Sequence, residues 1–144
     1  MNTTPPRHSV SVSGVIPDDH GRVLLIRRRD NQHWEPPGGV LELGETIPDG
    51  LRREIREETG LDIEPDALTG VYKNMPRGII ALVFRCKITG GHLTPNDEAT
   101  AFRWADRNTI HELTSEAYAV RLLDALSADS AAAVRQHDGI RLLR

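Results

Sequence analysis

The most constraining feature of this 144-residue chain is one fixed spacing of glycine, glutamate and arginine within residues 39–61. Gly39 is followed after five residues by Glu45, and seven further residues lead to the run Arg53-Glu54-Ile55-Arg56-Glu57-Glu58-Thr59-Gly60-Leu61. Seven fixed letters at about 7% average usage each would match by chance about once in 10⁸ starting positions. Coincidence is therefore excluded, and the segment predicts a dedicated structure.

The same segment predicts a helix from Ile47 to Thr59. Thr46, followed three residues later by Asp49, is typical of a helix start, and Gly60 is typical of a left-handed helix end. Three apolar residues recur at helical spacing and predict one buried stripe: Ile47, Leu51 and Ile55. Gly50 lowers the stability of a helix interior by about 1 kcal/mol. Either the helix packs very closely there, or the weakness is tolerated.

Three carboxylates crowd a second face of this predicted helix. Glu54, Glu57 and Glu58 stand at positions i, i+3 and i+4, close to the C-terminal, negative end of the helix dipole. Like charges at this spacing repel one another. A hard divalent cation would reverse the sign, because Mg²⁺ binds carboxylates, waters and substrate phosphates through oxygen. The alternative is an acidic solvated face interleaved with the arginines at positions 52, 53 and 56.

The spacing in residues 39–61 resembles the Nudix box, and this favours a metal site over a solvated face. The resemblance extends to the paired strands before the box, to the Pro37-Gly38-Gly39 run and to Trp104 after it. Nudix proteins generally split a diphosphate linkage in a nucleoside diphosphate attached to another group, using one to three Mg²⁺ or Mn²⁺ ions. The resemblance implies an α/β/α sandwich with a mixed sheet.

The resemblance also implies a metal site and a support for it. The implied ligands are the carbonyl oxygen of Gly39 and the carboxylates of Glu54, Glu57 and Glu58. Arg53 would pair with Glu45 and anchor the loop to the helix, a contact that orients the ligands. Several carboxylates are needed because metal ions must neutralise the diphosphate, acidify a bound water and stabilise the departing phosphate.

A positioned carboxylate that takes the proton of this water adds about 10²- to 10⁴-fold to the rate. The candidates for this general base are Glu54, Glu57 and Glu98. Glu98 resembles the loop carboxylate that many members of the family bring over the metals, and Asp97 adjoins it. The alternative for both loop residues is a solvated surface position.

Substrate contacts are implied just before the box. Arg28 resembles a residue that clamps phosphate, for which a planar guanidinium is suited. Trp34 is a candidate for stacking on a base, and Gly38 and Gly39 are candidates for backbone contacts with the substrate. The alternatives are a solvated arginine and a core tryptophan.

Composition limits the class of protein. At 144 residues the chain is expected to form a single domain, residues 1–144, with a core of its own. The single cysteine, Cys86, excludes a disulfide framework and is expected in a strand. The segment from Met1 to His8 is polar, and no stretch is long enough to span a membrane, so a cytoplasmic protein is expected. A net charge of −3 argues against binding to nucleic acid.

The remaining pattern predicts strands and one further helix. Residues 10–16 and 23–26 read as a hairpin joined by the turn at 17–21, and further strands are expected near 68–73, 79–88 and 102–104. Gly90-Gly91 is expected to form a turn. Thr114 or Ser115 is expected to cap a C-terminal helix, and Asp138-Gly139 is expected to form a hairpin turn. This order predicts an α+β fold with a mixed sheet.

Two functions from different classes follow. The first is a metal-dependent pyrophosphohydrolase acting on a small nucleotide, either a nucleoside triphosphate, as in MutT-type enzymes, or an ADP-ribose-like compound, which Pro76 weakly favours. The second is a non-catalytic module that senses a nucleotide without cleaving it. Five intact box residues argue against the sensor: Glu45, Arg53, Glu54, Glu57 and Glu58. The oligomeric state is left open between a monomer and a homodimer.

Overall fold

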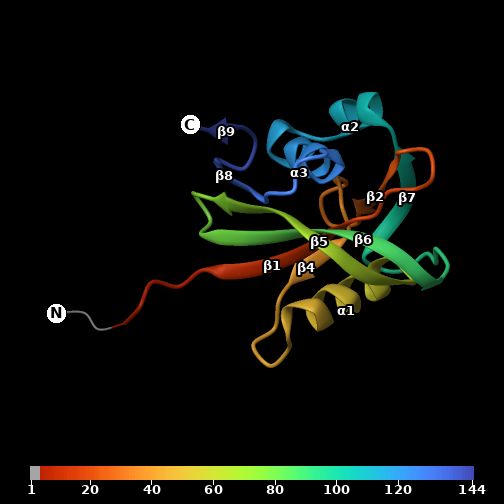
Figure 1. Cartoon of the computed structure of the whole chain (residues 1–144). Helices are drawn as coiled ribbons and strands as arrows, with labels where there is room; N and C mark the ends of the chain where they lie inside the picture. The colour runs from red at the N-terminus through yellow and green to blue at the C-terminus, as the bar shows by residue number, and fades with distance from the viewer. Residues whose placement is uncertain (1–3) are drawn as a thin grey trace.

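The computed structural model describes residues 4–144, and its strands form two sheets (Figure 1). The larger sheet has six strands in the spatial order β4 (Gly38–Val40), β1 (Ser9–Val15), β6 (Ile79–Gly91), β5 (Leu61–Asn74), β8 (Ala133–His137) and β9 (Leu142–Leu143). The smaller sheet has three, in the order β3 (Trp34–Glu35), β2 (Val23–Arg28) and β7 (Ala99–Ala105). The larger sheet is mixed, since β1 pairs with β6 and β5 with β8 in parallel and the other pairs are antiparallel.

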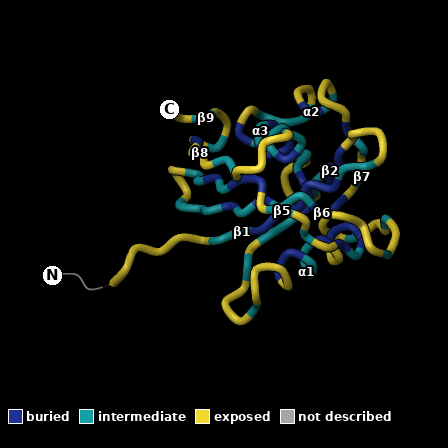
Figure 2. Tube along the Cα trace, viewed as in Figure 1, coloured by how far each residue is buried: buried dark blue, intermediate teal, exposed yellow. Residues whose placement is uncertain are grey.

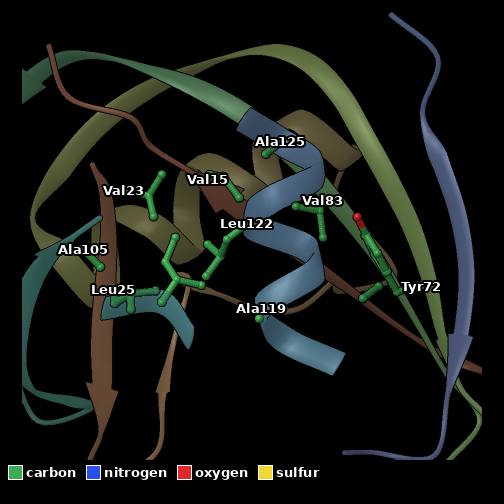
Figure 3. Packing of buried hydrophobic residues seen from close by; sticks show 11 residues of the cluster. Val15, Val23, Leu25, Tyr72, Val83, Ala105, Ala119, Leu122 and Ala125 are labelled. Atoms are coloured by element: carbon green, nitrogen blue, oxygen red, sulfur yellow. The ribbon is translucent and has the colours of Figure 1, made fainter. Parts of the chain in front are cut away.

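Helices cover both faces of the larger sheet (Figure 1). The helix α1 (Ile47–Thr59) lies on one face, and α3 (Glu116–Leu126), preceded by the short α2 (Arg107–Leu113), lies on the other. Leu51 and Ile55 of α1 pack with Val12 of β1, while Leu122 of α3 packs with Val83 of β6 (Figure 3). The predicted α+β sandwich with a mixed sheet is confirmed. Along the trace, burial is concentrated where the sheet and these helices meet (Figure 2).

The helix α1 has the predicted bounds, and local contacts explain why. The Thr46 hydroxyl accepts a hydrogen bond from the Asp49 backbone N–H at 3.2 Å, and Gly60 ends the helix with φ +81°. Gly50 is buried, and a Cβ there would lie 2.5 Å from Leu41 Cδ1 and 2.8 Å from Glu45 Oε1. The glycine is therefore explained by close packing of the helix against the loop that precedes it.

The predicted hairpin of the first two strands is wrong. The turn exists, since the Asp18 backbone N–H donates to the Arg22 carbonyl at 2.7 Å. Beyond it the strands separate: β1 pairs with β4 and β6 in the larger sheet, and β2 pairs with β3 and β7 in the smaller one. The turn therefore carries the chain from one sheet to the other. Beside it, Pro17 and Val23 form an isolated bridge, and the Leu24 backbone N–H donates to the Ile16 carbonyl at 3.2 Å.

Other predicted boundaries need correction. β5 begins at Leu61, directly after the helix, and three register shifts interrupt its pairing with β6. Gly90 and Gly91 end β6 and pair with β5 instead of forming a separate turn, and α2 was not predicted. The C-terminal helix is confirmed with Ser115 as its N-cap residue, and the Asp138-Gly139 hairpin is confirmed by the antiparallel pairing of β8 with β9.

Cys86 lies in β6 and is buried, as predicted, and its burial raises the pKa of its thiol to about 12. Within residues 4–144, no helix is long and apolar enough to cross a membrane. The polar segment predicted from Met1 to His8 lies partly outside the described residues, because residues 1–3 are not described.

Candidate functional site

Glu58, on the last turn of α1, lies against the backbone of β4. Its side chain is buried, with 6% of the residue exposed, and its Oε1 accepts a hydrogen bond from the Gly38 backbone N–H at 2.7 Å. Burial raises the pKa of Glu58 to about 8, the Gly38 N–H opposes this, and the charges of Glu54, Glu35 and Glu98 add to it. The ionised carboxylate of Glu58 thus lies at a buried position where no positively charged side chain of residues 4–144 compensates it.

Glu54 lies one turn earlier on α1 and faces the next residue of β4. A Cβ added at Gly39 would collide with the Glu54 carboxylate, so the Glu54 side chain lies directly over Gly39 and would have to move to admit a larger residue. Burial raises the pKa of Glu54, although Arg53 opposes this increase. Glu57, by contrast, is exposed. Glu54 and Glu58 therefore lie against β4, at Gly39 and Gly38 respectively, whereas Glu57 lies at an exposed position of the same helix.

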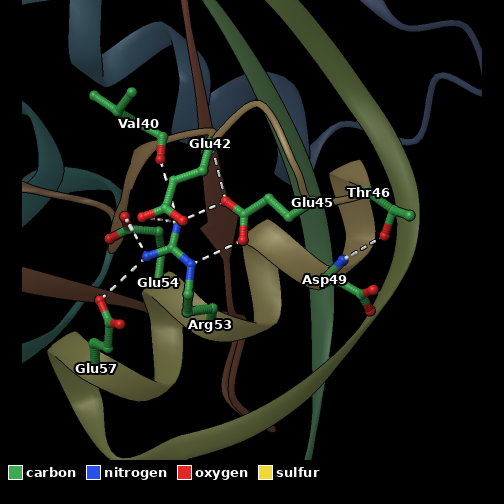
Figure 4. Close-up of polar contacts among 8 residues, drawn as sticks. All are labelled: Val40, Glu42, Glu45, Thr46, Asp49, Arg53, Glu54 and Glu57. Atoms are coloured by element: carbon green, nitrogen blue, oxygen red, sulfur yellow. Dashed lines mark hydrogen bonds and ion pairs between the residues drawn. The ribbon is translucent and has the colours of Figure 1, made fainter.

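Arg53 connects these carboxylates to the loop before the helix (Figure 4). Its Nε and Nη2 donate to the two Glu45 carboxylate oxygens at 2.9 and 2.6 Å. Its Nη1 donates to Glu54 at 3.0 Å and to Glu57 at 3.3 Å, and its Nη2 reaches the Val40 carbonyl at 3.3 Å. The hydrogen bonds from Arg53 lower the pKa of Glu45 to about 2. The pairing implied by the box is present in the structure.

The oxygen atoms at this site are of the chemical kind that binds a divalent metal ion. Within residues 4–144, no group of three or more His, Cys, Asp or Glu side chains is gathered closely enough to hold an ion as it stands. Arg53 instead supplies the positive charge beside Glu54 and Glu57. The available donors are nonetheless all hard oxygen atoms, which suit Mg²⁺ or Mn²⁺, and a cation would offset the raised pKa of the buried Glu58.

Asn96 fastens the loop after β6 to the end of α1. Its Nδ2 donates to the Glu58 carbonyl at 2.5 Å, and its Oδ1 accepts from the backbone N–H groups of Glu98 and Ala99 at 2.9 Å each. Sequence reasoning missed this residue. The available signal was an asparagine two positions before Glu98, where its side chain can close an Asx turn.

The two loop carboxylates have different surroundings. The Glu98 side chain is exposed, yet its charge contributes to the raised pKa of both Glu54 and Glu58, so it lies close to the cluster. Asp97 is fully exposed, and its carboxylate lies 3.8 Å from Arg29 Nη1. Of the two, Glu98 is the one whose charge acts on the carboxylates of Glu54 and Glu58.

A cavity of about 200 Å³ adjoins Gly38 and Gly39. Arg28 lines it, bonded to Asp30 at 2.7 and 2.9 Å and to Glu35 at 3.1 Å. Trp34 is not among its lining residues and packs against the core cluster under α3. Three further lining residues were missed: Glu35, Tyr118 and Arg121. Tyr118 and Arg121 come from α3, far along the chain, whereas Glu35 is adjacent to Trp34 and had no distinguishing signal.

Comparisons with known proteins identify the family. A model of the NUDIX domain matches residues 7–126. A MutT-like protein of Streptomyces ambofaciens is 55% identical over 141 residues, covering 98% of this chain and 91% of that protein. An ADP-ribose pyrophosphatase of Methanocaldococcus jannaschii is 38% identical over 112 residues, covering 73% of this chain and 66% of that protein.

The fold is shared with solved structures of NUDIX hydrolases. The structure of a NUDIX hydrolase from Nitrosomonas europaea superposes with a TM-score of 0.78 at 20% sequence identity, covering 93% of this chain and 82% of that one. At this level of identity the likeness concerns the fold alone. Together with the match over residues 7–126, it leads to one conclusion: the chain belongs to the Nudix family of hydrolases.

Proposed function

We propose that this Nudix protein is a Mg²⁺- or Mn²⁺-dependent pyrophosphohydrolase that cleaves the diphosphate linkage of a nucleoside diphosphate derivative. The observation that supports it most strongly is the buried Glu58, held against Gly38 and surrounded by other carboxylates. Such an arrangement is destabilising without a cation and becomes favourable with one. When bound, the metal ions would neutralise the diphosphate and acidify a water molecule.

Each side chain has a proposed task. Glu57, Glu58 and the Gly39 carbonyl oxygen would hold the metal ions, with Glu54 as a further ligand or the general base. Arg53, fixed by two hydrogen bonds to Glu45, would keep the ligands oriented. Glu98, on a loop fastened by Asn96, would take the proton from the attacking water.

The substrate is proposed more broadly. The relatives include a MutT-like protein and an ADP-ribose pyrophosphatase, so a nucleoside triphosphate and an ADP-ribose-like compound are both candidates. The cavity beside Gly38 and Gly39 would receive the part of the substrate that extends away from the diphosphate. Arg28 at its edge would contact phosphate, although its present bonds to Asp30 and Glu35 would have to rearrange.

A nucleotide panel tests the proposal. The wild-type protein is incubated with Mg²⁺ or Mn²⁺ and nucleoside triphosphates or ADP-ribose, and the release of nucleoside monophosphate is measured. We expect at least one substrate to be cleaved, and activity to vanish after exhaustive chelation. Full activity without metal would contradict the proposal. Tight binding without turnover under any condition would favour the sensing module instead.

A further inference from the structure

Arg121 is a buried cation without an anionic partner. The residue is 8% exposed, and burial lowers the pKa of its guanidinium. Within residues 4–144, its Nε is buried and has no hydrogen-bond partner, and no carboxylate lies within ion-pair distance of the side chain. A buried charge left this way destabilises the folded protein unless a partner arrives from outside.

The protein contacts of Arg121 position the guanidinium without satisfying it. Its carbon Cζ lies 5.3 Å from the ring centre of Tyr72 and 4.6 Å from that of Tyr118, which are cation–π contacts and offer no acceptor in the guanidinium plane. Its Nη2 lies 3.1 Å from His137 Nε2, while His137 Nδ1 faces the Gly139 backbone N–H at 2.9 Å. A neutral imidazole has one acceptor nitrogen, so His137 cannot accept from both.

The unsatisfied guanidinium lines the cavity beside the carboxylates of α1. The same cavity of about 200 Å³ is bounded by Gly38 and by Tyr118 and Glu35. Glu35 is close enough to Arg121 for each to influence the pKa of the other. The cavity therefore presents a hydrogen-bond donor, an acceptor and an aromatic ring within one small volume.

This combination selects among ligands. A phosphate would accept from Arg121 but offers no N–H group to Glu35, whose carboxylate lines the same cavity and is bonded to Arg28 at 3.1 Å. A planar base whose edge carries both a carbonyl oxygen and N–H groups matches both side chains and can contact the ring of Tyr118. Among bases, guanine offers two acceptors, O6 and N7, that an arginine commonly contacts, whereas adenine carries an amino donor in place of O6.

We propose that Arg121 is the specificity-determining residue of this cavity, donating hydrogen bonds to the carbonyl of a guanine-type oxopurine base. Glu35 would accept from the N–H groups of the same base. The inference rests on the proposed function, because the diphosphate must lie at the carboxylates of α1 for the base to enter the cavity. Arg121 would act on selection among nucleotides and leave bond cleavage to the other residues.

Competing nucleotides test the assignment. We would measure kcat/KM for GTP, ITP and ATP in the wild type, in Arg121→Met and in Arg121→Lys. ITP keeps O6 and N1–H and lacks only the 2-amino group, so it retains the contact with Arg121 and removes one of the N–H groups that Glu35 would accept from. We expect the wild type to favour GTP and ITP over ATP by about tenfold or more, and Arg121→Met to lose this preference. Arg121→Lys keeps the charge without the planar fork and should retain only part of the preference.

Arg77→Met is the matched control, because Arg77 lines the same cavity but is exposed. It should leave the ratio of GTP to ATP unchanged. Equal loss by Arg121→Met on all three nucleotides would overturn the inference, because it would place Arg121 on a group common to them, such as a phosphate. An unchanged ratio in a folded Arg121 variant, with folding checked by thermal melting, would overturn it as well.

A second measurement separates this inference from the proposed function. Equilibrium binding of guanosine and adenosine to the metal-free protein requires neither metal nor cleavage. Tighter binding of guanosine, lost in Arg121→Met and kept in Arg77→Met, would support the inference even if no nucleotide were cleaved. Equal binding of the two nucleosides by the wild type would overturn it even if pyrophosphohydrolase activity were present.

Discussion

Arg53 contacts Glu45 through two parallel hydrogen bonds, at 2.6 and 2.9 Å, and this pair joins the middle of α1 to the loop that leads into it. The same guanidinium donates hydrogen bonds to Glu54 and Glu57, so one side chain contacts both the loop and the acidic face of the helix. A fixed planar fork is needed for this geometry, which a lysine cannot reproduce. The pair also explains why glutamate and arginine stand eight positions apart in the sequence.

Replacing Arg53 should therefore affect stability and activity together. Arg53→Ala should lower the melting temperature and reduce metal affinity or activity by about 10- to 100-fold, the usual range for residues that orient metal ligands. Arg56→Ala is the control, since Arg56 lies on the same helix, is exposed and contacts Asp62 at 3.1 Å. Thermal melting and metal titration check the result. A pure loss of kcat with unchanged stability would instead place Arg53 on the substrate.

Removing the charge of Glu58 should separate activity from stability. Glu58→Gln should lower kcat by about 10²-fold or more, because the shape is kept while a charge on the metal is lost. The metal-free variant should melt at a higher temperature than the wild type, since a buried carboxylate no longer has to be accommodated and the amide oxygen can still accept from Gly38.

Glu57→Gln should show the same loss of kcat with little effect on stability, because Glu57 is exposed. Glu64→Gln serves as the control for both variants, as Glu64 is exposed and is bonded to Arg52 at 2.8 Å. Circular dichroism and steady-state kinetics would check these outcomes. Inactivity that accompanies unfolding would leave the metal-ligand assignment without support.

The loop carboxylates provide a direct comparison. Glu98→Gln should reduce turnover while leaving metal binding to the free protein nearly unaltered, because Glu98 is exposed on the loop that Asn96 holds. Asp97→Asn should have little effect. Wild-type rates for Glu98→Gln together with a defect in Asp97→Asn would assign the general base to Asp97. Wild-type rates for both variants would assign the general base to Glu54 or Glu57.

Acid should weaken the packing of α3 through Asp124. Its carboxylate accepts from the Tyr72 hydroxyl at 2.6 Å and from Arg135 at 2.8 Å twice. Burial raises the pKa of Asp124, but the hydrogen bonds from Arg135 and Tyr72 outweigh this and hold it below its usual range. Because the pKa is lower in the folded state, the stabilisation is present above the ordinary pKa near 3.8 and is lost as the pH falls through the lowered value.

The variant Asp124→Asn should consequently be less stable than the wild type at pH 7, by about 1 to 3 kcal/mol. The difference should shrink as the pH falls from the ordinary pKa near 3.8 through the lowered pKa of the folded state. Denaturant unfolding at several pH values measures it. A difference that stays constant through this range would show that the ionised form of Asp124 contributes nothing.

Features encoded by neighbouring residues were predictable, and those set by distant contacts were not. The start of α1 at Thr46 and its end at Gly60 depend on contacts within a single turn of helix, so their signals lie side by side in the sequence. The strand β1 is present as predicted, but it pairs with β4 and with β6, which lies far along the chain, and a strand-like run carries no information about which strand lies alongside. The false hairpin arose from this limit.

The candidate site divides in the same way. The carboxylates of α1 and the Arg53–Glu45 pair follow from fixed spacing, and the structure contains the two hydrogen bonds of that pair. The role of the carboxylates as metal ligands stays a prediction. Arg121 reads in isolation as an ordinary arginine of an amphipathic helix. Arg121 is buried by the packing of α3 over the sheet, which leaves its Nε without a hydrogen-bond partner, so no local pattern could have identified it.

The carboxylates and the cavity are attached to opposite layers of the sandwich: Glu58 belongs to α1, whereas Tyr118 and Arg121 belong to α3. They meet at the short strand β4, where Gly38 contacts Glu58 and also lines the cavity. If the proposed roles hold, the two layers can evolve separately. Substitutions on α3 would then redirect the enzyme toward a new nucleotide while the hydrolytic residues on α1 stay unchanged, which would allow one ancestral catalyst to diversify into a range of selective descendants.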